Sequence, residues 1–197
     1  RLAELDAATR KGYSDFAYQR AFSALFNFCT VDLSSVYFDI RKDALYCDDA
    51  ASITRRACRT VLDHLFTCVV TWLAPMLCFT MEEAWLTRFP GAEESVHLQL
   101  FPAIPAEWRN EALGRKFAAM RTVRRVVTGA LELERAEKRI GASLEASPVL
   151  FLSDRDLLAA IAALDMAELC ITSGFAVRPL AEAPQGAFRL PESQDKL

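Results

Sequence analysis

Apolar residues recur at helical spacing from the start of the chain to about residue 140. They predict an aromatic-rich helix between Asp15 and Cys29, and Asp32 is expected to cap the helix that follows. The apolar stripe of this following helix consists of Leu33, Val36, Tyr37, Ile40 and Ala44. Because these residues recur at helical intervals, they predict a helix that is buried along a single face.

A third helix is predicted to begin near residues 49–52 and to end at Leu73. Pro75 lacks a backbone donor and disfavours helix in the residue before it, so the chain should turn there. The buried side of the third helix is predicted to consist of Ile53, Ala57, Val61, Leu65 and Val69. Thr80 and Glu83 have the spacing of a capping box, which predicts the start of a fourth helix.

A loop containing prolines is expected over residues 91–109, followed by a long helix from about Glu111 to Arg139. The inner stripe of this long helix is predicted to be Leu113, Phe117, Met120, Val123, Val127, Ala130 and Leu131. Consecutive helices joined by short connections and buried on one face pack as antiparallel neighbours. Residues 1–140 are therefore predicted to form an antiparallel helix bundle.

The pattern changes after Gly141, where short apolar runs and alternation replace the long helical stripes. The expected elements are a strand at 149–152, a helix opened by Ser153 and Asp156 and continuing to 163, a strand at 167–171 and a third strand at 187–190. Residues 141–197 therefore predict a small α+β domain. The whole chain is expected to be mainly α, with the helix bundle first and this domain after it.

The composition is typical of a globular protein. The 197 residues are 52% hydrophobic and 25% charged, with a net charge of −3, so bulk charge does not point to nucleic acid. No stretch of about 18 uncharged apolar residues occurs, so we expect no membrane span. The six cysteines include no C-x-x-C pair, and we expect buried thiols in a reducing cytoplasm and no metal site.

Residues suited to catalysis are scarce. His64 falls within a predicted helix and His97 in a predicted loop, and neither has a recognisable nucleophile and acid around it in sequence. Glu82 and Glu83 point about 100° apart on a helix and are expected to serve its N-terminus. The sequence contains no glycine-rich phosphate loop. We therefore expect neither a catalytic residue nor a bound cofactor in this chain.

Arginines supply the best candidates for a binding site. Arg55, Arg56 and Arg59 cluster on the first turns of the third helix, opposite its predicted apolar face. Residues 115–139 contain eight Lys or Arg and three Glu, a local charge of +5. The candidates on one face of this long helix are Arg121, Arg125 and Arg139, with Arg124 and Arg135 beside them. Arginine binds phosphate by charge and by paired hydrogen bonds, so both groups are candidate RNA-backbone contacts.

A simpler interpretation applies to each of these features. Exposed arginines on helices usually face solvent or pair with an acid one turn away, such as Glu132 with Arg135. Aromatic side chains that could stack on unpaired bases cannot be separated from core aromatics by spacing alone. Trp108 and Phe175 are the best candidates for such stacking.

Four segments resemble a known family. The segments that resemble the anticodon-binding domain of isoleucyl-tRNA synthetases are NFCTVDLSSVYFDIRKDALYC at 27–47, SITRRACRTVL at 52–62 and RIGASLEA at 139–146. The segment LAPMLCFTMEEAW at 73–85 is similar to a turn that the isoleucyl, valyl and leucyl enzymes share. The resemblance covers about residues 1–175. It is most specific in the segments at 27–47 and 139–146.

This resemblance implies that the chain docks a tRNA(Ile) anticodon stem and loop for a class I aminoacyl-tRNA synthetase that uses ATP. The His-Ile-Gly-His and Lys-Met-Ser-Lys-Ser signatures of the family are absent, which implies that this stretch does not catalyse the reaction. The chain is expected to be a monomer. Bacterial members of the family often end in a zinc module, and this sequence ends at Leu197 without one. Either the stretch was cut before the module or the parent lacks it.

Two alternatives stay open at this point. The chain could be the corresponding domain of a valyl or leucyl enzyme, because the segment at 73–85 does not separate the three. It could also be a helical protein–protein interaction domain, in which the arginine faces meet another protein.

Overall fold

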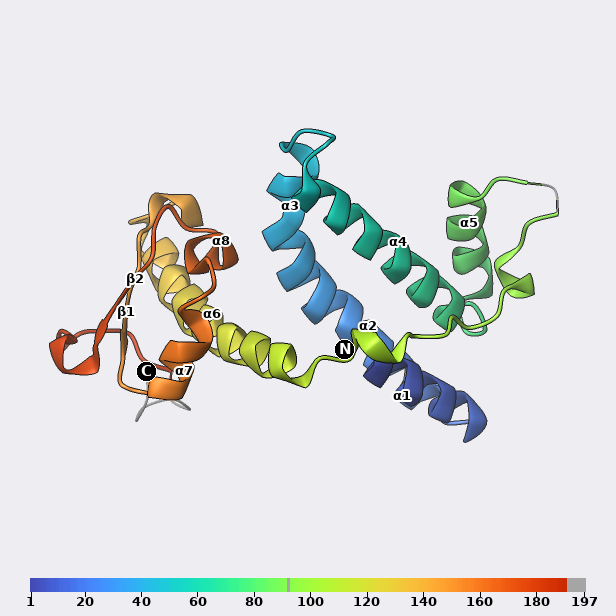
Figure 1. Cartoon of the computed structure of the whole chain (residues 1–197), viewed down its shortest axis with the longest axis horizontal. Coiled ribbons are helices and arrows are strands. Elements are labelled where there is room, and N and C mark those ends of the chain that lie inside the picture. The colour runs from blue at the N-terminus through green and yellow to red at the C-terminus, as the bar shows by residue number, and fades with distance from the viewer. Residues whose placement is uncertain (92, 191–197) are drawn as a thin grey trace. The chain divides into compact units, whose positions relative to one another are not determined.

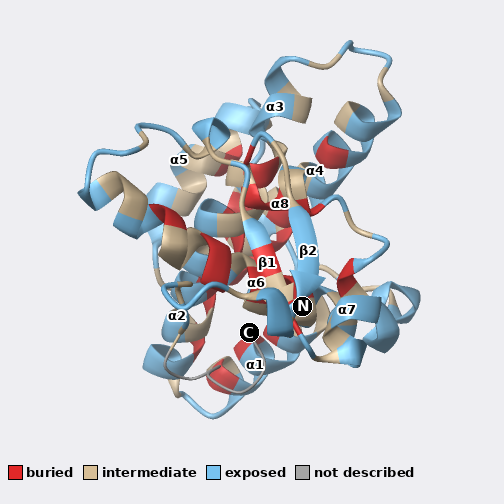
Figure 2. Ribbon diagram, turned by 90° about the vertical axis from the view of Figure 1, so that its left-hand side faces the viewer, coloured by how far each residue is buried: buried red, intermediate tan, exposed pale blue. Residues whose placement is uncertain are grey.

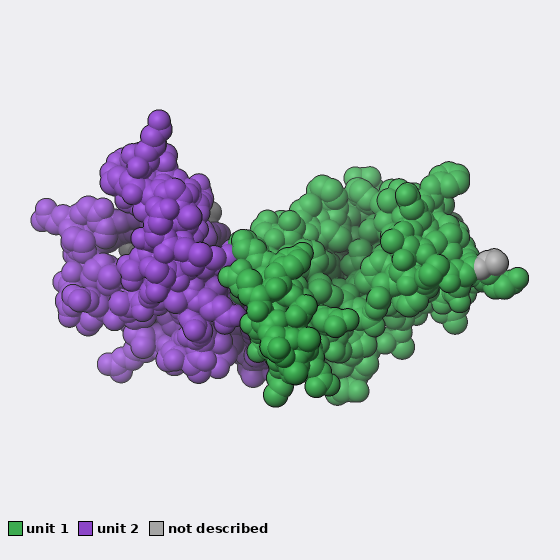
Figure 3. Space-filling view, turned by 90° about the horizontal axis from the view of Figure 1, so that it is seen from above, with its two compact units in different colours: residues 1–109 green, residues 110–197 purple. Residues whose placement is uncertain are grey.

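The computed structural model describes residues 1–91 and 93–190. It divides the chain into two compact units, residues 1–109 and residues 110–197 (Figure 3). The prediction that the chain is mainly α, with a small α+β part after the helices, is confirmed. The predicted domain boundary near residue 140 differs from the observed division, because the long helix of residues 111–136 packs on later helices of its own unit. It therefore belongs to the second compact unit.

The first unit consists of helices joined by short connections (Figure 1). Its elements are α1 (Leu2–Ser14), α2 (Tyr18–Asn27), the π-helix η1 (Phe28–Phe38), α3 (Asp39–Tyr46), α4 (Ile53–Leu73), α5 (Cys78–Arg88) and the short 3-10 turns η2 (Val96–Leu98) and η3 (Ala106–Trp108). The largest buried cluster of this unit consists of Leu5, Leu25, Phe28, Leu33, Leu65, Cys68, Trp72 and Leu73. This cluster joins α1, α2, η1 and α4.

Helices α2, η1 and α3 run on without a break from Tyr18 to Tyr46. The prediction that Asp32 caps a new helix is therefore wrong. Asp32 lies inside η1, is buried, and accepts a hydrogen bond from Nε of Arg1 at 3.1 Å. The helix passes through this position because apolar residues on both sides of Asp32, including Phe28 and Leu33, belong to one core. The favourable burial of these residues outweighs the local tendency of an aspartate to start a helix.

The continuous helix of residues 18–46 is long and apolar enough to cross a membrane by length and composition alone, with a mean hydropathy of 1.2. The expectation concerned a stretch without charged residues and is not contradicted, because one such helix is weak evidence for a membrane span. In the structure this helix supplies Leu25, Phe28 and Leu33 to the core of the first unit and packs on α1 and α4. Core helices of globular domains pass the same test.

Helix α4 ends before Pro75, as predicted, but its buried side differs from the predicted one. Ile53 is 83% exposed and Val61 is also exposed, while Cys58, Leu65 and Cys68 are buried. The predicted residues are four apart, and each step of four rotates a helix by about 40° beyond a full turn. Over four steps that line drifts by about 160°, so it leaves the buried face.

The predicted capping box at Thr80 is also wrong. Helix α5 already begins at Cys78, with Leu77 as the residue before it, because the carbonyl of Leu77 accepts from the backbone N–H of Met81 at 2.9 Å. Glu82 does not serve the start of this helix. Its carboxylate accepts hydrogen bonds from the hydroxyl of Ser95 at 3.0 Å and the backbone N–H of Val96 at 2.8 Å, which ties α5 to η2.

Tyr13 connects α1 to the end of α4 and leads to a pH prediction. Its hydroxyl donates to the carbonyl of Trp72 at 2.7 Å, and burial raises the pKa of Tyr13 to about 12. Because this pKa lies above the unfolded value near 10, the stabilisation is fully present below pH 10 and is lost as the pH rises toward 12. We expect Tyr13→Phe to lower the free energy of unfolding by about 1 kcal/mol at neutral pH and to weaken its decline above pH 10.

Urea denaturation followed by circular dichroism, repeated at several pH values, measures both effects. Tyr46→Phe is the matched control, because this ring is exposed and its hydroxyl has no hydrogen bond among the described residues. An identical pH dependence in wild type and Tyr13→Phe would contradict the assignment.

The second unit packs a long helix against shorter elements. Its elements are α6 (Glu111–Ala136), η4 (Ser143–Glu145), β1 (Val149–Leu152), α7 (Arg155–Ile161), α8 (Met166–Cys170), β2 (Ala176–Pro179) and η5 (Leu180–Glu182). Strands β1 and β2 pair in parallel, with Val149 opposite Ala176. Figure 2 shows β2 exposed along its length, whereas β1 contributes buried Leu150 and Leu152. Helix α6 packs on α7 and α8.

Several predicted details of this unit change in the structure. Residues 166–170 form helix α8, because Asp165 caps its start and Met166, Leu169 and Cys170 are buried at helical spacing. The predicted strand at 167–171 is therefore wrong. Residues 187–190 form no strand, and α7 is capped by Asp154, one residue after the predicted Ser153. On α6, Leu113 and Phe117 of the predicted stripe are exposed, and Val126 is buried with Met120, Val123, Val127 and Leu131.

Candidate functional site

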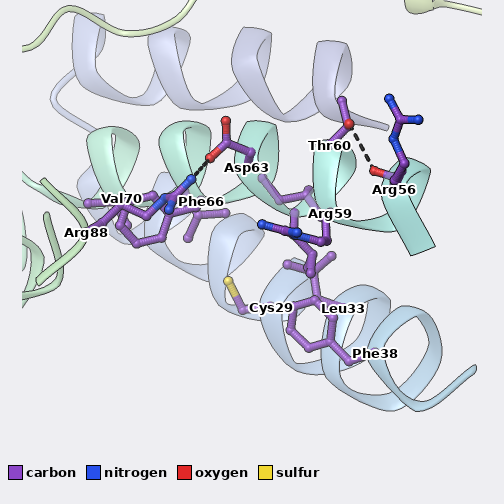
Figure 4. A pocket seen from close by; sticks show the side chains of 13 residues that line it. Cys29, Leu33, Phe38, Arg56, Arg59, Thr60, Asp63, Phe66, Val70 and Arg88 are labelled. Carbon is purple, nitrogen blue, oxygen red and sulfur yellow. Dashed lines mark hydrogen bonds and ion pairs between the residues drawn. The ribbon is translucent and has the colours of Figure 1, made fainter. Parts of the chain in front are cut away.

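Arg56 and Arg59 lie on the first two turns of α4, which is positioned by its cap and by its contacts with α3. The hydroxyl of Ser52 accepts from the backbone N–H of Arg55 at 3.4 Å and opens the helix. Arg56 and Arg59 are three residues apart and therefore share one side of it. Both side chains are exposed, and both line a pocket between η1 and α4 (Figure 4).

This η1–α4 pocket has a volume of about 820 Å³. Its lining residues are Cys29, Leu33, Phe38, Arg56, Arg59, Thr60, Leu62, Asp63, Leu65, Phe66, Val69, Val70 and Arg88. The apolar residues come from η1 and from the inner side of α4, whereas the charged ones come from the outer turns of α4 and the end of α5. A pocket of roughly 300–1,000 Å³ that combines an apolar wall with a few polar groups is typical of ligand sites.

The charges in this pocket fall into two groups. Asp63 and Arg88 form an ion pair, so their charges offset each other (Figure 4). Among residues 1–91 and 93–190, the guanidinium groups of Arg56 and Arg59 have neither a hydrogen bond nor an ion pair. The pocket therefore carries two cationic groups whose hydrogen-bond donors are available to a ligand.

Arg55 is placed differently from its two neighbours. It is half-buried, and its guanidinium donates to the carbonyl of Asp48 at 2.8 Å, which fastens the loop between α3 and α4. Sequence spacing alone does not distinguish Arg55 from Arg56, because both occur on the first turns of α4. Arg55 is not among the pocket residues.

The arginines of the second unit divide between exposed and structural positions. Arg121 and Arg125 are exposed on one side of α6, and each takes part in an interaction within the protein. Nε of Arg124 donates to the carbonyl of Leu169 at 2.8 Å and ties α6 to α8. Arg135 bonds Glu132 and the hydroxyl of Ser143, so it holds the segment that follows α6.

Arg139 lies beyond the end of α6 and is paired with two acids. Its guanidinium bonds both carboxylate oxygens of Glu134 and also meets Glu137. The hydrogen bond from Arg139 holds the pKa of Glu134 below its usual range, and the same bond raises the pKa of Arg139. The structure therefore does not bring Arg139 together with Arg121 and Arg125 as one cationic face, because its charge is offset locally.

The structure also gives the exposure and contacts of the two candidate stacking aromatics and of the cysteines. Trp108 is 45% exposed and packs edge-on against His64, with ring centroids 4.8 Å apart, and Phe175 is half-buried. All six cysteines are free thiols, and burial raises the pKa of Cys29. In the described part of the chain, no group of three His, Cys, Asp or Glu side chains is arranged to hold a metal ion.

Three pocket residues with charged or aromatic side chains, Asp63, Arg88 and Phe38, were not among the candidates from sequence spacing. Asp63 lies one turn after Arg59 on α4, a signal that was present in the sequence. Arg88 and Phe38 come from α5 and η1, which are distant from α4 along the chain, so no local pattern points to them. Their place in the site depends on the packing of three helices.

Comparison with known proteins identifies the family of the helical unit. Residues 1–150 match the family described as the anticodon-binding domain of tRNA ligase. The chain is 58% identical over 192 residues to the isoleucine–tRNA ligase of Agrobacterium fabrum, covering 98% of this chain and 20% of that relative. It is 58% identical to the enzyme of the same name from Mesorhizobium japonicum and 57% identical to that from Ruegeria pomeroyi, again covering 98% of this chain.

The chain thus spans about a fifth of the length of these curated relatives. The match to the family extends over most of the chain and includes the whole first unit, with α4 and the η1–α4 pocket. The chain therefore belongs to the family of tRNA ligase anticodon-binding domains.

Proposed function

We propose that this chain is the tRNA-docking part of an isoleucine–tRNA ligase and binds the anticodon stem and loop of tRNA(Ile). Its relatives at 58% identity are named isoleucine–tRNA ligases, which favours the isoleucyl enzyme over the valyl and leucyl enzymes. The parent enzyme attaches isoleucine to tRNA with ATP in the cytoplasm, as a monomer, and this chain contributes binding without catalysis. Zinc belongs to the parent only where it carries a further cysteine-rich module.

The observation that supports this proposal best is the pair of available guanidinium groups at Arg56 and Arg59. RNA binding is dominated by contacts of Arg and Lys with phosphates, which hold the backbone without reading its sequence. Two arginines three residues apart on one helix present several fixed donors to neighbouring phosphates. This concentrates positive charge on a chain whose net charge is −3.

The other candidates take secondary roles in the proposal. Arg121 and Arg125 are exposed on α6 and form a second phosphate contact. Arg55 acts mainly by fixing the loop before α4, since its guanidinium bonds the carbonyl of Asp48. Arg139 contributes least, because Glu134 and Glu137 offset its charge.

Filter binding of the chain to tRNA(Ile) at two salt concentrations tests the proposal. We expect measurable affinity at low salt and a steep loss as salt rises, because bound phosphates release counterions. Unmodified transcripts of tRNA(Val) and tRNA(Leu) are the matched controls, and tighter binding of either would assign the chain to that enzyme. Absence of binding to all three at low salt would support the protein–protein interaction alternative instead.

The two ion pairs of Arg139 give a separate prediction. We expect Arg139→Ala to change tRNA affinity by less than about twofold, because Glu134 and Glu137 already occupy the donors of this guanidinium and leave few for a phosphate. Arg125→Ala removes one charge from the same unit and serves as the comparison. A larger loss for Arg139→Ala than for Arg125→Ala in the same titration would show that the ion pairs open on binding.

A further inference from the structure

We infer that the η1–α4 pocket receives one unstacked guanine of the bound RNA, and that Asp63 and Arg88 recognise the edge of this base. The inference rests on the proposed function, since it assigns base recognition to the pocket beside the proposed phosphate contacts. Four observations lead to it: the size of the pocket, its apolar wall, its available arginines and its ion pair.

The pocket has the parts that single-stranded RNA requires. Sequence-specific RNA recognition acts on unstacked bases, which lie against aromatic or guanidinium planes and form hydrogen bonds along their edges. The pocket offers Phe38 from η1, which is 40% exposed, and the half-buried Phe66 from α4. Its volume of about 820 Å³ is sufficient for a nucleotide-sized ligand.

One wall of the pocket is a π-helix. Residues 28–38 form η1, which supplies Cys29, Leu33 and Phe38 to the lining. The hydroxyl of Ser35 donates to the carbonyl of Thr30 at 2.9 Å, five residues earlier. π-Helical turns are rare and are frequently found at functional sites. The opposite wall is regular α-helix from α4, so the two walls differ in backbone geometry.

The order of charges along α4 matches the order of groups in a nucleotide. Arg56 and Arg59 lie at one end of the pocket, and Asp63 follows Arg59 by one helical turn. Figure 4 shows Arg88 meeting Asp63 on the side of Phe66 and Val70, while Arg59 lies on the side of Leu33 and Phe38. A nucleotide bound along this direction places its phosphate toward the two arginines and its base toward the ion pair.

The ion pair selects guanine among the four bases. A carboxylate accepts from the N1–H and N2–H groups of guanine, and a guanidinium donates to O6 and N7. N1–H and O6 are adjacent on this edge, so Asp63 and Arg88 meet the base while they remain neighbours. Adenine places an acceptor, N1, opposite the carboxylate and therefore leaves it without a hydrogen bond. Uracil is the nearest competitor, because its N3–H and O4 repeat the pair formed by N1–H and O6, but it offers the carboxylate of Asp63 one donor where guanine offers two.

The ion pair is also free to exchange partners. The side chains of Asp63 and Arg88 are 52% and 50% exposed, and such surface pairs contribute little to stability. A guanine that offers two donors and two acceptors replaces water around both side chains without leaving a buried charge unpaired. The pair can therefore recognise a base without a large loss of stability.

Fluorescence anisotropy of the full chain with labelled RNA hexamers tests this inference. The hexamers differ only at the third base, which is guanine, uracil, cytosine or adenine. We expect the guanine hexamer to bind on the order of tenfold more tightly than the adenine hexamer. Asp63→Asn should reduce this preference to less than about twofold and leave the salt dependence unchanged, because no phosphate contact is lost.

Glu83→Gln is the matched control variant. Glu83 is an exposed acid on α5 outside the pocket, so this change removes the same charge and should retain the preference for guanine. Equal loss of preference in both variants would overturn the inference, because it would then reflect net charge. A preference for uracil or cytosine over guanine would overturn the assignment of the base.

The reactivity of Cys29 toward alkylation tests whether the RNA binds in the η1–α4 pocket. Cys29 is half-buried and lines the pocket, whereas Cys78 is exposed and lies outside it. We expect the guanine hexamer to slow alkylation of Cys29 severalfold and to leave Cys78 unchanged, as measured by mass spectrometry of the peptides. Binding that leaves Cys29 as reactive as in the free chain would place the guanine elsewhere.

Two further outcomes separate this inference from the proposed function. If tRNA binds in a manner that depends on Arg56 and Arg59, yet the four hexamers bind equally, the inference fails and the proposed function stands. If neither tRNA nor any hexamer binds at low salt, both fail. Guanosine 5′-monophosphate is titrated in parallel, and an affinity equal to that of the guanine hexamer would identify a free nucleotide as the ligand and overturn the RNA source.

Discussion

Replacement of Arg56 and Arg59 by alanine should weaken tRNA binding by about tenfold or more at low salt, the largest effect expected for any surface change. Both guanidinium groups line the η1–α4 pocket and have no bonding partner in the described part of the chain. Their removal takes away two proposed phosphate contacts. The slope of log affinity against log salt should therefore decrease in magnitude by about 2, roughly one for each contact.

Titrations of wild type and variant at several salt concentrations measure both quantities. Arg20→Ala combined with Arg115→Ala is the matched control, since it removes two exposed cations from α2 and α6 that, like Arg56 and Arg59, have no ion pair among the described residues and lie outside the pocket. Equal losses in the two double variants would show that only net charge matters. Lysine at both positions should restore part of the affinity, because lysine keeps the charge and loses the paired hydrogen bonds of arginine.

Trp72→Ala should lower the free energy of unfolding of the first unit by about 3–5 kcal/mol. Trp72 is completely buried and packs in the cluster that joins α1, α2, η1 and α4. Truncation removes a large apolar surface from that core and leaves a cavity that the surrounding helices fill only partly. The same change also loosens the packing around Leu65 and Leu73, which lie in the same cluster on α4.

Urea denaturation followed by circular dichroism measures this loss. Trp108→Ala is the control with the same chemistry, because Trp108 is 45% exposed and contacts mainly the ring of His64. We expect it to lower the free energy of unfolding by less than about 1 kcal/mol. Similar losses for the two tryptophans would contradict the assignment of Trp72 to the centre of the core.

The predictions from sequence succeeded where local chemistry acts alone. α4 ends before Pro75 as expected, because proline has no N–H to continue the helical hydrogen bonds, although Ala74 before it keeps a helical backbone and donates to the carbonyl of Val70. The short apolar run at 149–152 is a strand, and the long stretch after residue 110 is one helix. They failed where one pattern fits two structures, as at 166–170, where alternation and helical spacing are both present in five residues.

The candidate binding site was predictable in part. Arg56 and Arg59 were identified from their spacing, and both line the pocket. Arg55 and Arg139 could not be separated from them by sequence. The difference depends on the partners that the fold provides, which are the carbonyl of Asp48 and the carboxylates of Glu134 and Glu137.

The sequence by itself determined that the chain is mainly helical, where α4 ends and which helices carry clusters of arginine. These properties depend on residues within about one helical turn of one another, and the interactions that set them are local. The tertiary structure alone decided that the helix continues through Asp32 and that Asp63, Arg88 and Phe38 meet in one pocket. These side chains come from different helices, and only the shared burial of apolar faces brings them together.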